Sequence, residues 1–257
     1  MARRLRRMVA ALPIGAVGGS VACSSAQPSL QRELDNLRSQ EASMRAQWLE
    51  DERQGLRKLP PRAWPLNQPK VDEIPELRAS LLRERCPPAN LPMSQACETL
   101  TFDLATALVF NSVDAHSGLA SYQGLSENGH VDGMVARGVC LTEGLGADRD
   151  EPTGLSWLRR AVDLGSAQGA YELGTLYLTG GAELEEDESA AFKLFELAAA
   201  QEHAAAMFMV ADCLLDGVGC GPNADKSRAV PLLFAAAKKG HRGARQYMRQ
   251  LWDGTWR

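Results

Sequence analysis

Residues 169–180 have the sequence GAYELGTLYLTG, and residues 187–199 have the sequence DESAAFKLFELAA. Apolar residues recur at helical spacing in both stretches. A glycine follows the first stretch, which is typical of a helix C-terminus, and an aspartate opens the second, which is typical of a helix N-cap. The two stretches therefore predict a helix, a turn and a second helix.

The same pattern recurs along the C-terminal part of the chain at a spacing of 36 to 38 residues. Glycines end the first helix of successive units at Gly144, Gly180, Gly217 and Gly254, and aspartates precede the second helix at Asp150, Asp187 and Asp225. Small residues at 138, 174 and 211 predict close approach of the two helices. One helical hairpin cannot bury its apolar face alone, so we expect neighbouring hairpins to stack around a continuous core.

These residues resemble the Sel1-like repeat (SLR) family, a relative of the tetratricopeptide repeat (TPR). The resemblance rests on Gly169-x-x-x-Leu173-Gly174-x-x-Tyr177-x-x-Gly180 and on Asp225-x-x-Arg228-Ala229, and it covers roughly residues 98–257. It implies an all-α, α/α superhelix of about three and a half to four helical hairpins, with a concave surface for partner proteins. Two residues depart from the pattern: Arg137 replaces the usual leucine, and Pro231 lies inside a predicted helix, which should be kinked or should start late.

The first 26 residues have the composition of a leader and tether. A basic start with Arg3, Arg4, Arg6 and Arg7 precedes an apolar or small stretch over 8–22, and no acidic residue occurs before Glu33. Residues 20–23, Ser-Val-Ala-Cys, resemble a bacterial lipoprotein box, although that family usually has leucine where Ser20 stands. The resemblance implies lipidation of Cys23, and Ser24 after it implies the outer membrane.

The composition of this N-terminus also fits two further kinds of targeting signal. Ordinary signal cleavage after Ala22 or Ala26 suits the small residues there, and an arginine-rich, acid-poor start also fits a mitochondrial transit peptide. The segment could also be an N-terminus with no targeting role. We therefore expect a bacterial cell envelope protein that is lipid-anchored and faces the periplasm, with the mitochondrion as the alternative.

Two segments separate the leader from the repeats. Residues 27–59 are rich in strong helix formers, and apolar residues recur at heptad-like spacing from Leu30 to Trp48, which predicts a helical stalk and a candidate short coiled coil. Residues 60–97 contain many prolines and form a predicted linker, in which residues 76–85 are a candidate short helix.

The cysteines allow two disulfides. Cys86 and Cys97 flank a proline-rich loop that a disulfide would close, and the alternative is two unpaired thiols. Cys213 and Cys220 flank a turn that a second disulfide would fasten to its helix, although core packing is the better explanation for Cys213, as for its repeat equivalent Cys140.

No motif indicates a catalytic or metal site. His130, His203 and His241 occupy one repeat position just past the ends of the second helices, which predicts a helix-terminus role. Stacked hairpins would hold them too far apart to share a zinc ion. The sequence lacks a phosphate-binding loop and a nucleophile–base motif, so we expect no enzyme, cofactor or metal. A net charge of −4 argues against a nucleic-acid partner, and no apolar run is long enough for a membrane span.

These observations predict a non-enzymatic protein-interaction scaffold or adaptor. Aromatic and arginine side chains dominate many interfaces, so Tyr171, Phe208, Tyr247 and Arg245 are candidate contacts on the concave face. The alternatives are a secreted SLR-type hydrolase, or β-lactam- or cell-wall-binding protein, and a mitochondrial assembly factor.

Overall fold

The computed structural model describes residues 70–89, 91–181, 184–221 and 224–252. All the regular structure in these ranges is helical. The predicted leader with Cys23, the helical stalk and the first part of the linker lie outside the described residues. Within the described ranges, no helix has the length and apolar character that a membrane crossing needs.

The helices follow one another as antiparallel pairs. The short turn η2 (Val71–Glu73) and α2 (Ile74–Arg83) come first, followed by the pairs α3 (Gln95–Phe110) with α4 (Ala115–Glu127), α5 (Val131–Glu143) with α6 (Glu151–Asp163), α7 (Ala167–Thr179) with α8 (Glu188–Ala200), and α9 (Ala204–Asp216) with α10 (Ala229–Lys238). The turn η3 (Lys226–Arg228) precedes α10, and α11 (Arg242–Trp252) comes last.

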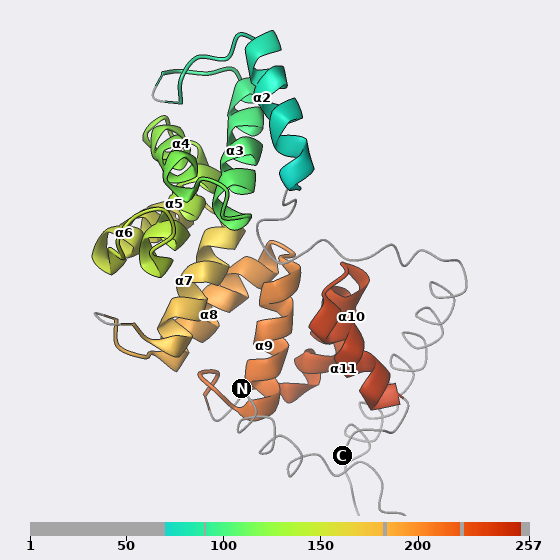
Figure 1. Ribbon diagram of the computed structural model, residues 1–257. Coiled ribbons are helices and arrows are strands. Elements are labelled where there is room, and N and C mark those ends of the chain that lie inside the picture. The colour runs from blue at the N-terminus through green and yellow to red at the C-terminus, as the bar shows by residue number, and fades with distance from the viewer. Residues whose placement is uncertain (1–69, 90, 182–183, 222–223, 253–257) are drawn as a thin grey trace, which may run out of the picture.

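Each helix packs against the next along the chain, so the pairs stack into one curved row that runs from α2 to α11 (Figure 1). Apolar side chains from successive pairs form the core; the largest cluster joins α8, α9, α10 and α11 around Phe195, Leu214 and Met248. This architecture confirms the predicted all-α fold of stacked helical hairpins.

Side-chain caps fix where the helices begin. Asp114, Asp150 and Asp187 accept a backbone N–H at the starts of α4, α6 and α8, as predicted for the last two. In the fourth hairpin the corresponding Asp225 caps the 3-10 turn η3, and α10 begins only at Ala229. The predicted effect of Pro231 is therefore confirmed as a delayed and shortened helix.

Small residues allow the two helices of a hairpin to cross closely. A Cβ added at Gly138 of α5 would lie 2.7 Å from Leu158 Cγ and 3.0 Å from the Gly154 carbonyl oxygen of α6. At the corresponding Gly174 of α7, the obstacle would be the ring of Phe195, 2.8 Å away. Both positions therefore serve the close packing that the sequence predicted.

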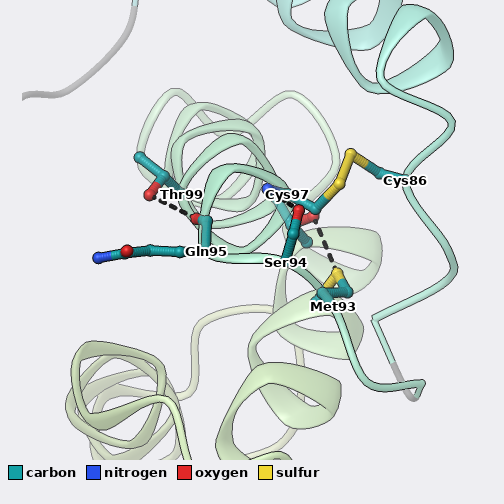
Figure 2. Close-up of a disulfide and its surroundings, with 7 residues drawn as sticks. Cys86, Met93, Ser94, Gln95, Cys97 and Thr99 are labelled. Atoms are coloured by element: carbon teal, nitrogen blue, oxygen red, sulfur yellow. Dashed lines mark hydrogen bonds between the residues drawn. A yellow bond between two sulfur atoms is a disulfide. The ribbon is translucent and has the colours of Figure 1, made fainter.

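The end of the predicted linker belongs to the folded region. α2 packs on α3 through Ile74, Ala107 and Leu108, and a disulfide between Cys86 and Cys97 joins the loop after α2 to α3 (Figure 2). The same loop is held to α4, because Asn128 Nδ2 donates to the carbonyl oxygens of Ala89 and Leu91 at 2.8 and 3.1 Å. A helix and a cross-linked loop thus extend the first hairpin on its N-terminal side.

Candidate interaction surface

The first helices of successive hairpins share an unusual N-terminal cap. The Nδ1 atoms of His130, His203 and His241 accept the backbone N–H of Gly133, Ala206 and Ala244 at 3.0, 3.2 and 3.2 Å. Ser166 performs the same task for α7 through its hydroxyl. The predicted helix-terminus role of these histidines is confirmed, and an imidazole that accepts through Nδ1 must be neutral.

An aromatic ring from the preceding hairpin lies against each capping imidazole. Ring centroids are 5.5 Å apart for Phe102 and His130, 5.1 Å for Tyr171 and His203, and 4.6 Å for Phe208 and His241. Tyr171 and Phe208, two predicted partner contacts, are half-buried in these pairs. Their rings therefore also hold neighbouring hairpins together.

A polar chain extends from one of these caps. The Nε2 atom of His203 lies 2.8 Å from Gln168 Oε1, and Gln168 Nε2 donates to Glu172 Oε1 at 2.6 Å. Burial lowers the pKa of His203 to about 4. Burial also raises the pKa of Glu172 to about 7, and the negative charge of the nearby Glu143 raises it in the same direction. No sequence motif indicated this chain, because its members come from α7 and from the turn before α9.

A groove of about 350 Å³ lies between α6 and α8. Leu173 and Tyr177 of α7 and Leu194 of α8 form its apolar floor. Arg159, Asp163 and Lys193, which are all exposed, line its rim. Of these, Arg159 donates to the Tyr177 hydroxyl at 3.4 Å.

A second hollow, of about 850 Å³, lies beside the end of α7 and is lined by polar groups that include Arg149 and Glu186. Arg149 forms an ion pair at 3.0 Å with Glu151, whose carboxylate is almost wholly buried. The charge of Arg149 is thus already balanced by its own chain.

Comparison with known proteins agrees with the repeat spacing. The Sel1 repeat family matches residues 131–166, 167–203 and 204–241, which correspond to α5–α6, α7–α8 and α9–α10. The chain contains three consecutive Sel1 repeats. Each Sel1 repeat begins directly after a capping residue, His130, Ser166 or His203.

Two solved structures are similar to this Sel1-repeat chain. A Sel1 repeat protein from Oxalobacter formigenes is 23% identical, with a TM-score of 0.46, over 51% of this chain and 97% of that one. The protein c5321, a protective antigen present in uropathogenic Escherichia coli strains that displays an SLR fold, is 20% identical, with a TM-score of 0.52. That match covers 69% of this chain and only 36% of c5321, and it shows a shared fold. No curated protein matches the sequence significantly.

The remaining two predicted partner contacts lie at the end of the Sel1 array. Tyr247 is only 8% exposed and packs in the core of the last hairpins, so little of its ring is open to a partner. Arg245 is half-buried, and its Nε donates to the Ala237 carbonyl oxygen at 3.1 Å. Both side chains thus help to attach α11 to the repeats.

The second predicted disulfide is not formed. Cys213 and Cys220 carry free thiols, as does Cys140. The Cys213 side chain is buried in the core, whereas the Cys220 thiol turns toward the Cys213 carbonyl oxygen, 3.4 Å away. Burial raises the pKa of the Cys140 and Cys213 thiols to about 12. Across the described residues, no three His, Cys, Asp or Glu side chains gather as a metal site would require.

Proposed function

We propose that this chain is a non-enzymatic scaffold or adaptor that binds partner proteins through its Sel1 repeats. The observation that carries the proposal is the use of its reactive side chains to hold the fold. All four histidines place a ring nitrogen within hydrogen-bond distance of a backbone group, including His116 Nδ1 at 3.2 Å from the Gly146 carbonyl oxygen. The thiols of Cys140 and Cys213, with pKa values near 12, are poor nucleophiles at neutral pH.

We further propose that the repeats act outside the cytoplasm, on a lipid anchor at Cys23 in the bacterial outer membrane, facing the periplasm. The Cys86–Cys97 disulfide supports an oxidising compartment. The intact mass of the mature protein from native membranes tests the anchor. A species that begins at Cys23 with diacylglycerol and acyl mass is expected. An unacylated soluble species would contradict the anchor, and a cleavage site further along the chain would favour an organelle.

Photo-crosslinking in the native cell tests the scaffold. A benzophenone amino acid replaces Leu164, which caps the C-terminus of α6, or Leu197 in α8; these side chains are 55% and 45% exposed. A scaffold predicts discrete light-dependent adducts with other polypeptides from at least one of these positions. The absence of adducts at both, together with turnover of a β-lactam or of peptidoglycan by the mature protein, would contradict it.

A further inference from the structure

The groove between α6 and α8 has counterparts in the neighbouring hairpins, which show how such a groove is normally closed. Arg159 lies nine residues after the N-cap aspartate of α6, and Glu196 lies nine residues after that of α8. Ala190 and Arg228 each lie three residues after the N-cap aspartate of the following unit. The pairs Arg159 with Ala190 and Glu196 with Arg228 therefore occupy equivalent positions.

One hairpin further along, this pair bridges the two second helices. Arg228 donates to Glu196 Oε1 at 2.8 Å, so an arginine and a carboxylate join α8 to the start of α10. Between α6 and α8 the corresponding residues are an arginine and an alanine, and both line the open groove. Arg159 therefore faces an alanine in place of an oppositely charged side chain, and this pair of positions cannot form the bridge.

In the preceding hairpin a half-buried arginine lies in the equivalent space. Arg137 stands where the groove floor has Leu173, and its guanidinium lies 4.4 Å from the Trp157 ring centroid. The same group donates to Ser126 Oγ at 3.0 Å and pairs with Glu127 at 3.5 Å. The grooves on either side of α6–α8 are therefore occupied by the chain's own charged groups.

The open groove keeps an apolar floor below cationic groups. Arg159 and Lys193 approach it from opposite helices, and neither forms an ion pair with any described residue. Asp163 shares the rim and offsets one of the two cationic charges of Arg159 and Lys193. A single carboxylate from a partner is enough to balance the other charge, so a polyanion is not needed. A groove of about 350 Å³ holds a few side chains of an extended peptide.

We propose that this groove binds an acidic segment of a partner protein. The segment places one Asp or Glu carboxylate between Arg159 and Lys193, and an adjacent apolar side chain covers Tyr177 and Leu194, which are both half-buried. In this arrangement the partner's carboxylate takes the part that Glu196 plays toward Arg228. The inference rests on the proposed scaffold function and assigns it a place and a chemistry.

Peptide selection with the full-length protein tests the groove. A displayed library of random dodecapeptides is selected on the wild-type chain, and the enriched peptides are synthesised with a fluorescent label for titration. We expect peptides with an acidic residue next to an apolar one. Because a charge-assisted hydrogen bond is lost, Arg159→Gln and replacement of the peptide's acid by its amide should each weaken binding about tenfold. The two changes together should weaken it little further, because they remove the same contact.

A variant in which the groove is closed gives a more stringent test. Arg159→Glu with Ala190→Arg installs the neighbouring bridge at the equivalent positions and should abolish peptide binding. The matched control, Glu196→Ala with Arg228→Ala, removes the natural bridge and should leave the affinity unchanged. Thermal unfolding checks that both double variants fold. If the closed-groove variant does not fold, Lys193→Gln takes its place in the binding test.

The proposal is overturned if the enriched peptides lack acidic residues, or if their affinity is the same for the wild-type and the closed or Arg159→Gln proteins. This outcome differs from failure of the scaffold. Adducts at Leu164 or Leu197 together with a groove that binds no acidic peptide would reject the groove alone. Absence of adducts at both positions, together with turnover of a β-lactam or of peptidoglycan, would reject the scaffold.

Discussion

His203 lies against Tyr171 of the preceding repeat, with ring centroids 5.1 Å apart, while its Nδ1 accepts the Ala206 backbone N–H. The imidazole therefore begins one helix and packs on another at the same time. Because capping uses the lone pair of Nδ1, protonation of this atom would replace an acceptor with a donor. The junction between two repeats is thus linked to pH.

Stability should fall in mild acid partly because of His203. Burial lowers its pKa in the folded protein to about 4 from an ordinary value of 6.5. The unfolded chain then binds more protons between these values, so this contribution is complete above pH 6.5 and is lost as the pH falls toward 4. His203→Ser, which copies the Ser166 cap, should show a shallower loss between pH 7 and 5 in urea unfolding.

Two variants complete this test. His203→Ala should lose about 1 kcal/mol at pH 7.5, because the helix cap disappears. Ser166→Ala should lose a similar amount, of about 1 kcal/mol, at every pH, because no titrating group is involved. If His203→Ser follows the wild-type pH profile, the imidazole does not link this junction to pH.

Glu172 should have the opposite pH dependence. Burial raises its pKa to about 7 from 4.5, so the folded chain binds the additional proton and the ionised carboxylate lowers stability as the pH rises from 4.5 to 7. Glu172→Gln keeps an acceptor for Gln168 and should raise the free energy of unfolding by about 1–2 kcal/mol at pH 8. The gain should disappear near pH 4, and an equal gain at both pH values would contradict the assigned cause.

The crossing of α5 and α6 should not tolerate a methyl group. Gly138→Ala raises helix propensity by about 1 kcal/mol, but the new Cβ would meet Leu158 Cγ at 2.7 Å and the Gly154 carbonyl oxygen at 3.0 Å. We expect a net loss of about 1–3 kcal/mol, because neither backbone can yield easily. Ala211→Gly, at the corresponding position of α9, is the control. It should also destabilise, by about 1 kcal/mol, since it removes a buried methyl group and adds a flexible backbone. Increased stability of Gly138→Ala in urea unfolding would show that the helices are not in close contact.

Reduction of the Cys86–Cys97 disulfide should loosen the N-terminal end of the fold. The bond closes a loop with a sequence separation of 11, and such a loop contributes about 3 kcal/mol through the entropy of the unfolded chain. Hydrogen exchange with and without reductant should therefore show faster exchange in α2 and no change in α7–α9. The double variant Cys86→Ser with Cys97→Ser should show the same exchange rates with and without reductant. Unchanged exchange in α2 of the wild-type protein would contradict a stabilising role.

Local structure could be predicted from the sequence better than contacts between repeats. The spacing of Gly144, Gly180 and Gly217 predicted where the hairpins lie, and Pro231 predicted a late start for α10. Both predictions were possible because helix caps and the proline ring act within a few residues of the chain. The chain from His203 through Gln168 to Glu172 could not be predicted, since it depends on how one hairpin twists relative to the next. The packing of α2 on α3 could not be predicted either, because it also depends on how two helices are placed relative to each other.

The open groove was also missed, although the sequence contains its signal. Alignment of the units at Asp150, Asp187 and Asp225 sets Arg159 beside Glu196 and Ala190 beside Arg228. That comparison shows a lost charge pair. Only the structure shows that the positions from successive units face each other across a groove.

The most direct test of the open groove as a binding site is an equilibrium titration of the full-length protein with the partner identified by photo-crosslinking. Wild-type protein is compared with Arg159→Glu plus Ala190→Arg and with Glu196→Ala plus Arg228→Ala. We predict that the closed groove weakens binding at least tenfold, because a charge-assisted contact is lost and the apolar floor is covered, while the control keeps the wild-type affinity. Equal affinity of all three proteins would contradict a binding role for the groove.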